Sequence, residues 1–291
     1  MKAITFLFIL LSFAPAAYAQ SDKPILVEPK WLQEHLHDPD LVLLQVTFLK
    51  LDYDREHIEG AQYLWPEWLA PNSPEGSYNL PDLSKATALL EGYGVTEKSH
   101  IVLYHIRNEV SPTARMFLTL ENLGFRGRVS FLNGGMEAWK KESLPVTNAV
   151  PVARKGKVRL TAGDLIVNKE YVLKSLKSES GTVVDARMKN YYDGDPTGNP
   201  RDGHITGAKN LPYTEMVDAT NRFKTTEELQ NYFREVAPPE KELVTYCFIG
   251  QTASVVYMAG RLLGYNMKLY DGSLQEWSRI ESLPMEKTVK Q

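Results

Sequence analysis

The segment Tyr246-Cys247-Phe248-Ile249-Gly250-Gln251-Thr252-Ala253 decides the fold. It follows an apolar, β-branched run at residues 243–246 and leads into an amphipathic helical pattern at residues 252–259. Cys247 therefore lies at the turn between an expected strand and an expected helix. In open α/β sheets, ligands bind at the carboxyl ends of the strands, where such turns gather. The segment predicts an α/β sheet with a binding site at Cys247.

Cys247 is the single cysteine of the 291 residues, so it has no partner for an intramolecular disulfide. It is then either a buried apolar filler or a reactive thiol. Backbone N–H groups of such a turn and of the helix N-terminus that follows stabilise an anion, and this field lowers the pKa of a thiol. Gly250 lets the loop backbone approach the sulfur, while Thr252 can donate its hydroxyl to sulfur or cap the helix. We expect a nucleophilic sulfur here.

The motifs around this segment occur twice in the same order, with a spacing of roughly 140 residues. His-Ile-x-Gly-Ala stands at residues 57–61 and 204–208, and Leu-Gly followed by an aromatic residue stands at 123–125 and 263–265. Trp139 and Trp277 occupy matching positions near the end of each copy, and we expect them to pack each core. A repeat of this length indicates a duplicated domain, and the chain length suits two. We expect an N-terminal domain at 23–148, a polar linker at 149–158 and a C-terminal domain at 159–291.

Short β-branched runs alternate with helical patterns in both copies. We expect strands at residues 41–46, 101–104, 129–132, 182–185, 243–246 and 267–270. Such alternation predicts parallel sheets covered by helices. One helix is marked by a capping box of Thr225 and Glu228 and ends before Pro238.

The N-terminus has the pattern of a signal peptide. Lys2 precedes an apolar run at residues 4–13, and Ala17-Tyr18-Ala19 supplies a small-residue cleavage site. Because the run falls short of the ~20 apolar residues that span a bilayer, we expect cleavage after residue 19 and a secreted, periplasmic protein without a membrane anchor. A net charge of −3 gives no reason to expect a nucleic-acid partner.

These motifs together resemble the rhodanese family. The resemblance is carried by the C-x-x-G-x-T-A loop at 247–253, the turn Asp271-Gly272-Ser273, and two upstream motifs at 184–187 and 203–208. It covers residues 25–284. It implies an α/β fold of two tandem domains, each a parallel five-stranded sheet with helices on both faces, of which the first is inactive.

The resemblance also implies an activity, that of a thiosulfate or 3-mercaptopyruvate sulfurtransferase. Cys247 would take a sulfane sulfur from a small-molecule donor and hold it as a persulfide. A thiol, cyanide or a thioredoxin-like protein would then accept the sulfur, and no cofactor is needed. The loop residues that would surround the persulfide are Phe248, Ile249, Gly250, Gln251 and Thr252.

The identity of the sulfur donor stays open at the level of sequence. Relatives that prefer thiosulfate usually carry Arg or Lys directly after the cysteine, where this chain has Phe248 and Ile249. Relatives that use mercaptopyruvate usually have small residues there and a further Arg where this chain has Tyr191. The loop is more apolar than either pattern, which also suits a bulkier or less charged donor.

Three further residues are candidates for substrate binding. Arg201, in the polar loop at 193–203, resembles an arginine that holds the substrate carboxylate in mercaptopyruvate-using relatives; the alternative is a solvated loop charge. Asp185 and Arg187 follow a strand, where they either clamp substrate or pair with each other, and we favour the structural role. His57 and His204 each lack a second histidine at ligand spacing, so no metal site is expected.

Two other function classes compete with the sulfurtransferase. A non-enzymatic binding or redox-sensing module is favoured by the lack of a cation in the loop. A phosphatase on a related scaffold would need an Arg six positions after the cysteine, where this chain has Ala253, so this class is disfavoured. In the first copy, His105 takes the position of Cys247, and we interpret it as a substituted residue in a domain without a thiol.

Overall fold

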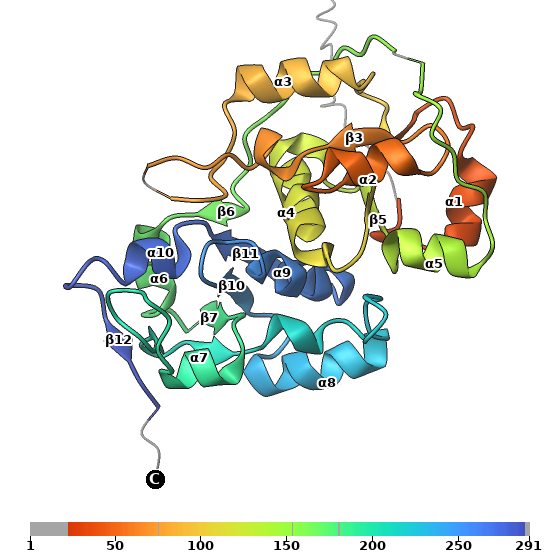
Figure 1. Cartoon of the computed structure of the whole chain (residues 1–291). Helices are drawn as coiled ribbons and strands as arrows, with labels where there is room; N and C mark the ends of the chain where they lie inside the picture. The colour runs from red at the N-terminus through yellow and green to blue at the C-terminus, as the bar shows by residue number, and fades with distance from the viewer. Residues whose placement is uncertain (1–22, 75, 153, 180, 289–291) are drawn as a thin grey trace, which may run out of the picture.

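The protein consists of two α/β halves that pack against each other. The structure, a computed structural model, describes residues 23–74, 76–152, 154–179 and 181–288. Each half contains a parallel five-stranded sheet, and helices α4 (Val110–Leu120) and α9 (Ala253–Leu262) meet between the halves (Figure 1). The expected signal peptide, residues 1–19, lies outside the described residues.

The first sheet has the strand order β1-β5-β4-β2-β3, and its neighbouring strands are all parallel. Its two faces follow from the alternation of side chains along each strand. Leu43 and Val102 pack with helices α1 and α5, whereas Leu44 and Leu103 pack on the opposite face with α3 and α4. The elements of this half are β1 (Leu26–Val27), α1 (Pro29–His35), β2 (Leu41–Val46), α2 (Lys50–Arg55), β3 (Gln62–Leu64), η1 (Pro66–Trp68), α3 (Leu83–Gly92), β4 (His100–His105), α4, η2 (Glu121–Phe125), β5 (Val129–Leu132) and α5 (Gly135–Lys141).

The second sheet repeats this arrangement in the order β6-β11-β10-β7-β9. Helices α6 and α10 cover one face, while α8 and α9 cover the other. A short antiparallel pair, β8 with β12, brings the end of the chain back onto the His204 motif. The elements are β6 (Ile166–Val167), α6 (Lys169–Ser175), β7 (Gly181–Asp185), α7 (Lys189–Asp193), β8 (His204–Ile205), β9 (Lys209–Asn210), η3 (Tyr213–Glu215), α8 (Thr226–Val236), β10 (Glu242–Tyr246), α9, β11 (Asn266–Tyr270), α10 (Ser273–Trp277) and β12 (Met285–Glu286).

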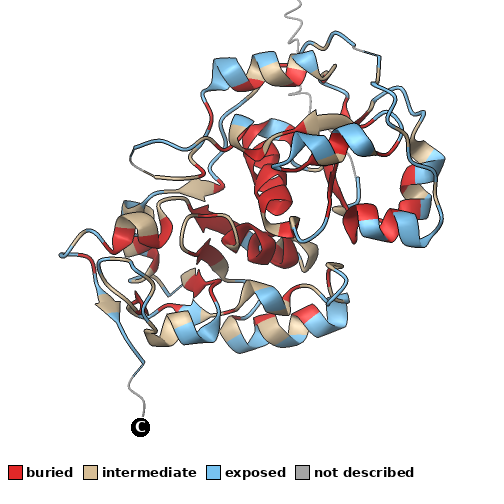
Figure 2. Ribbon diagram, in the orientation of Figure 1, coloured by how far each residue is buried: buried red, intermediate tan, exposed pale blue. Residues whose placement is uncertain are grey.

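The largest apolar core crosses from one half to the other. It contains side chains of α3, α4, α8 and α9 and of the sheet faces that these helices cover. Figure 2 shows buried residues on the two helices at the centre, α4 and α9, where they face each other. Trp139 and Trp277 each close a smaller core on the outer face of their sheet, as the sequence predicts. The two halves therefore share their interior.

The duplication is confirmed in detail by matching contacts. The backbone N–H of Ile58 donates to the hydroxyl of Tyr104 at 3.2 Å, and that of Ile205 donates to Tyr246 at 3.0 Å. In each copy the histidine before the isoleucine stacks on a tyrosine and bonds its carbonyl through Nδ1. The two histidines therefore make structural contacts that are equivalent in the two copies.

All six expected strands are present, with bounds that differ by at most one residue. The capping box is also confirmed: Thr225 accepts from the N–H of Glu228, and the Glu228 carboxylate accepts from the N–H of Thr225. Residues 156–159, in and beside the expected linker, bond to Glu91 and Glu97 of the first half. The end of this connection is therefore docked on the N-terminal half.

Across the part of the chain that the structure describes, no helix combines the length and apolar character needed to cross a bilayer.

Candidate active site

Cys247 is the first residue after β10, at the carboxyl end of the central strand of the second sheet. Its side chain is buried, with 1% of the residue exposed, and part of its surroundings is apolar. Polar groups lie on its other side. The N–H of Cys247 donates to the hydroxyl of Ser273 at 3.2 Å, and its carbonyl accepts from Leu274 at the start of α10. The backbone of Cys247 is thus tied to the turn that follows β11.

The loop at residues 247–252 runs from the end of β10 to the start of α9. Phe248, Ile249, Gln251 and Thr252 are half-buried, and Gly250 is buried with a φ of +79°, which favours glycine. The backbone N–H groups of residues 248–252 donate to no acceptor among the described residues. Buried N–H groups seldom remain unpaired, so these donors are available to an anion.

The hydroxyl of Thr252 does not cap α9, although the sequence allows that role. The hydroxyl of Ser254 instead donates to the carbonyl of Gly250 at 3.0 Å, which closes the loop onto the first turn of the helix. The cap alternative for Thr252 is therefore not found.

Arg187 is a cation next to the loop. It is 2% exposed and pairs with Asp185, with 2.6 Å between Nη2 and Oδ2 and 3.0 Å between Nε and Oδ1. Burial opposes its charge, but the bonds to Asp185 outweigh burial and raise the pKa of Arg187, and the charge of Cys247 acts in the same direction. Its guanidinium lies 5.0 Å from the ring centre of Phe248. Nη1 has no hydrogen-bond partner within the described chain.

Asp185 also organises the backbone beside the site. Its Oδ1 accepts from the N–H of Arg187, and its carbonyl accepts from Leu211 and from the side chain of Asn210. Asp185 and Arg187 thus make the contacts expected of the structural alternative, while Nη1 of Arg187 remains open to a further acceptor.

Arg201 makes contacts of a structural kind as well. Its guanidinium donates to four backbone carbonyls, at distances from 2.6 to 3.0 Å. The acceptors belong to Trp277, Ser278, Ile280 and Leu283, which follow or end α10. Because all three nitrogens of the guanidinium are engaged there, this geometry favours a loop anchor over a carboxylate clamp.

The N-terminal half also contributes to the surroundings of Cys247, which the sequence interpretation missed. Tyr78 interacts electrostatically with Cys247, and burial is the main cause that raises the pKa of Tyr78. Its φ of +59° is a strained value for a residue other than glycine. The side chain of Gln275 pins this segment to the second half through two hydrogen bonds to the backbone of Ser77. Nothing in the sequence near Tyr78 signals this contact.

His105 occupies the matching position in the first half. It is completely buried, and burial lowers its pKa to about 4. Nδ1 lies 3.2 Å from the carbonyl of Arg107, and Nε2 has no partner among the residues described. The ring is therefore neutral near pH 7. It offers no sulfur chemistry.

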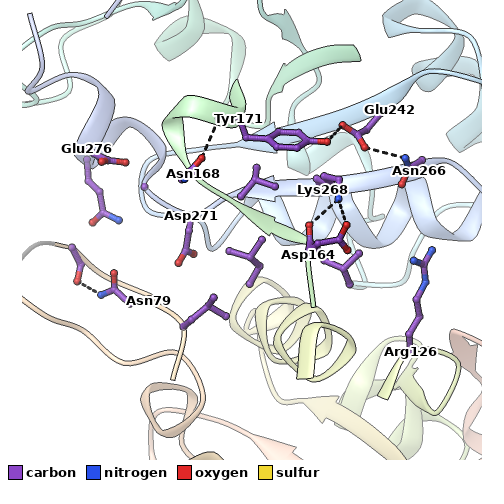
Figure 3. A pocket seen from close by; sticks show the side chains of 17 residues that line it. Asn79, Arg126, Asp164, Asn168, Tyr171, Glu242, Asn266, Lys268, Asp271 and Glu276 are labelled. Atoms are coloured by element: carbon purple, nitrogen blue, oxygen red, sulfur yellow. Dashed lines mark hydrogen bonds and ion pairs between the residues drawn. The ribbon is translucent and has the colours of Figure 1, made fainter. Parts of the chain in front are cut away.

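A hollow of about 920 Å³ lies beside the second sheet (Figure 3). Two charged or polar pairs occupy its wall: Lys268 bonds Asp164 at 2.9 Å, and Tyr171 bonds Glu242 at 2.6 Å. Asp271 lines it, but Cys247 does not. We place the candidate site at Cys247, because the thiol, the loop amides without an acceptor in the described chain, and the open Nη1 of Arg187 lie together there and not in the hollow. No group of three or more His, Cys, Asp or Glu residues suited to a metal occurs in the described ranges.

Comparison with known proteins agrees with this geometry. The family model described as "Rhodanese-like domain" matches residues 28–142 and again residues 168–280. The sulfur carrier protein TtuD of Thermus thermophilus is 31% identical over 280 residues, which cover 90% of this chain and 96% of the relative. A thiosulfate sulfurtransferase of Azotobacter vinelandii is 28% identical, covering 90% of this chain and 97% of its own.

A second enzyme type occurs among the relatives. A 3-mercaptopyruvate sulfurtransferase of Escherichia coli is 28% identical and covers 88% of this chain and 95% of its own. The crystal structure of SseA from Escherichia coli, described as a 3-mercaptopyruvate sulfotransferase, superposes with a TM-score of 0.77 at 27% identity. The match covers 86% of this chain and 99% of that structure, so the similarity includes both halves.

Proposed function

The chain belongs to the rhodanese-like family of sulfurtransferases, and on that premise we propose that Cys247 is the nucleophile that carries the transferred sulfur as a persulfide. One observation carries the proposal. The only thiol of the protein stands at the head of a loop with unpaired amides, beside a buried guanidinium whose Nη1 is open. Such hydrogen-bond donors stabilise a sulfur anion and an anionic substrate that donates sulfur.

In the first half of the reaction, the Cys247 thiolate attacks the transferable sulfur of the donor, which is the sulfane sulfur of thiosulfate or the thiol sulfur of 3-mercaptopyruvate. A sulfur–sulfur bond forms to Cys247 while the bond between that sulfur and the rest of the donor breaks. With thiosulfate, sulfite leaves with the bonding electron pair. With 3-mercaptopyruvate, the carbon–sulfur bond breaks, and the carbon that leaves takes up a proton to give pyruvate. The persulfide anion then faces the amides of residues 248–252.

In the second half, an acceptor removes the sulfur. A thiolate or cyanide attacks the outer sulfur of the persulfide, the bond to Cys247 breaks, and the electron pair returns to Cys247 as a thiolate. The products are a persulfide of the acceptor or thiocyanate. A thioredoxin-like protein is a suitable thiol acceptor, because its exposed thiolate performs the same displacement.

Arg187 supplies the charge that the loop lacks at Phe248 and Ile249. Nη1 can donate to the anionic part of the sulfur donor without loss of the pair with Asp185, which engages Nε and Nη2. The ring of Phe248, between Arg187 and Tyr191, orients the guanidinium through a cation–π contact. An apolar loop is thus compatible with an anionic donor.

Intact-mass measurement tests the proposal. After incubation with thiosulfate or with 3-mercaptopyruvate, the wild-type protein should gain the mass of one sulfur atom, and cyanide should remove it. Cys247→Ser should gain nothing under the same conditions. The proposal fails if the wild type stays unmodified with both donors, or if Cys247→Ser gains the same mass. Repeated addition of sulfur donor and acceptor distinguishes this enzyme from a redox-sensing module. The enzyme should transfer sulfur in every round, whereas the thiol of a sensor would be modified without multiple turnovers.

A further inference from the structure

A guanidinium from the N-terminal half reaches the loop of the C-terminal half. Arg115 lies on α4, and its side chain is completely buried. Nη1 lies 2.7 Å from Oδ1 of Asp271 and 3.4 Å from the carbonyl oxygen of Gly250, and Nη2 donates to the carbonyl of Tyr78. One side chain therefore touches the loop that follows β10, the turn that follows β11, and the Tyr78 segment.

The contact with Gly250 bears on the direction of the loop amides. In a trans peptide the C=O of one residue and the N–H of the next point in opposite directions, and the described residues contain no cis peptide bond. Arg115 and Ser254 both hold the carbonyl of Gly250, so they also fix the N–H of Gln251 on the opposite side. A Cβ at Gly250 would stand 3.1 Å from Nη1 of Arg115, which shows how closely the two approach.

The contacts of Arg115 are poor for a residue that serves stability alone. Nε has no hydrogen-bond partner in the described ranges, and Oδ1 of Asp271 is close to Nη1 without hydrogen-bond alignment. A buried charge that is incompletely satisfied costs stability, and an apolar side chain of similar size is often at least as stable. This loss of stability is explained if the charge of Arg115 positions the 247–252 loop.

We propose that Arg115 is a positioning residue: it orients the 247–252 loop from the other half, so that the loop amides face the sulfur of Cys247. The inference rests on the proposed function of Cys247 and assigns the N-terminal half, which has no thiol, a part in the reaction. The positive charge also lies on the loop, where it favours an anion. Removal of the side chain should therefore disfavour the ionised sulfur and misplace its donors.

Alkylation of Cys247 by iodoacetamide as a function of pH tests the inference, because it needs no sulfur donor. In Arg115→Met, the pH at half-maximal rate should rise, and the rate of persulfide formation at pH 7 should fall at least about tenfold. Arg115→Lys, which retains the charge but not the planar fork, should recover part of both. Arg187 and Tyr78, two ionisable groups that interact with Cys247, are not substituted in these variants.

Arg261→Met is the matched control, because Arg261 forms another cross-domain pair, with Glu121 at 2.9 Å, at the far end of α9. It should lower stability but leave the alkylation profile and persulfide formation as in the wild type. The inference is overturned if the profile of Arg115→Met coincides with that of the wild type, or if Arg261→Met shifts it equally. Should Arg115→Met not fold, the same comparison with Arg115→Lys decides. Absence of a sulfur adduct in the wild type refutes the proposed function, while the alkylation profiles still decide the role of Arg115.

Discussion

At the scale of single residues, the two copies differ most sharply at one position. Cys247 in the second copy and His105 in the first each lie at the carboxyl end of the central strand of their sheet: Cys247 is the first residue after β10, and His105 is the last residue of β4. The thiol lies among donors without acceptors, while the imidazole lies against Phe131 with a ring nitrogen that lacks a partner in the described chain. Under the proposed function, the same position serves chemistry in one domain and packing in the other.

Burial of His105 predicts a pH dependence of stability. Its pKa is about 4 in the folded protein and near 6.5 when exposed, so between these values the unfolded chain binds a proton that the folded chain does not. The contribution of neutral His105 to the free energy of unfolding is therefore fully present above pH 6.5. It is lost as the pH drops toward 4, and the loss is roughly 3 kcal/mol. Urea unfolding of the wild type and of His105→Asn at several pH values measures the effect.

Between pH 6.5 and 4, the free energy of unfolding should fall less steeply for His105→Asn than for the wild type. The difference in slope should correspond to the binding of up to one proton. His100→Asn provides a second case, because burial also lowers the pKa of His100 to about 4. Parallel curves for the wild type and His105→Asn would show that His105 does not carry this proton.

The residues of the site differ in how far sequence could predict them. Cys247 and Gly250 lie within a continuous motif, and a strand followed by a helix identifies their turn without knowledge of tertiary structure. Arg115 and Tyr78 could not be found in this way, because they come from the other domain. Arg115 touches the loop and bonds the carbonyl of Tyr78 only after α4 packs on α9. The role of Arg201 depends on four carbonyls that only the folded chain assembles.

At the scale of elements, the long central strands and the capped helix α8 were predictable, whereas the edge strands were not. Strands β1 and β6 have only two residues each, too few for an alternating pattern. They are defined by their hydrogen bonds to β5 and β11, which are far from them in sequence. Local pattern is informative for elements that bury several residues, and pairing alone decides the rest.

The capping box of α8 gives a prediction about this element. Thr225→Ala removes the acceptor for the N–H of Glu228 and should lower the free energy of unfolding by about 1 kcal/mol. Thr226→Ala, one residue into the exposed start of the helix, is the control and should change stability by less than about 0.5 kcal/mol. Chemical denaturation compares the two, and equal losses would mean that the cap does not stabilise α8.

At the scale of the whole molecule, the two domains are joined by apolar packing and by buried charges. Glu121, directly after α4, is 4% exposed and accepts hydrogen bonds from Tyr257 and Arg261 of α9. Arg115 and Asp271 form a second cross-domain pair nearer to Cys247. In the half that contains Cys247, the loop and the interface helix are therefore supported by a domain that carries no thiol.

Removal of the carboxylate of Glu121 should weaken this union. Glu121→Leu leaves Arg261 without its anion at a largely buried position, which should cost roughly 3 kcal/mol in the free energy of unfolding. Because the cost comes from an unpaired charge, the double variant Glu121→Leu with Arg261→Leu should recover most of it. Urea unfolding followed by fluorescence measures three variants: Glu121→Leu, Arg261→Leu and the double variant. If the double variant is no more stable than Glu121→Leu, the pair does not join the domains electrostatically, and apolar contact between α4 and α9 is then sufficient to hold them together.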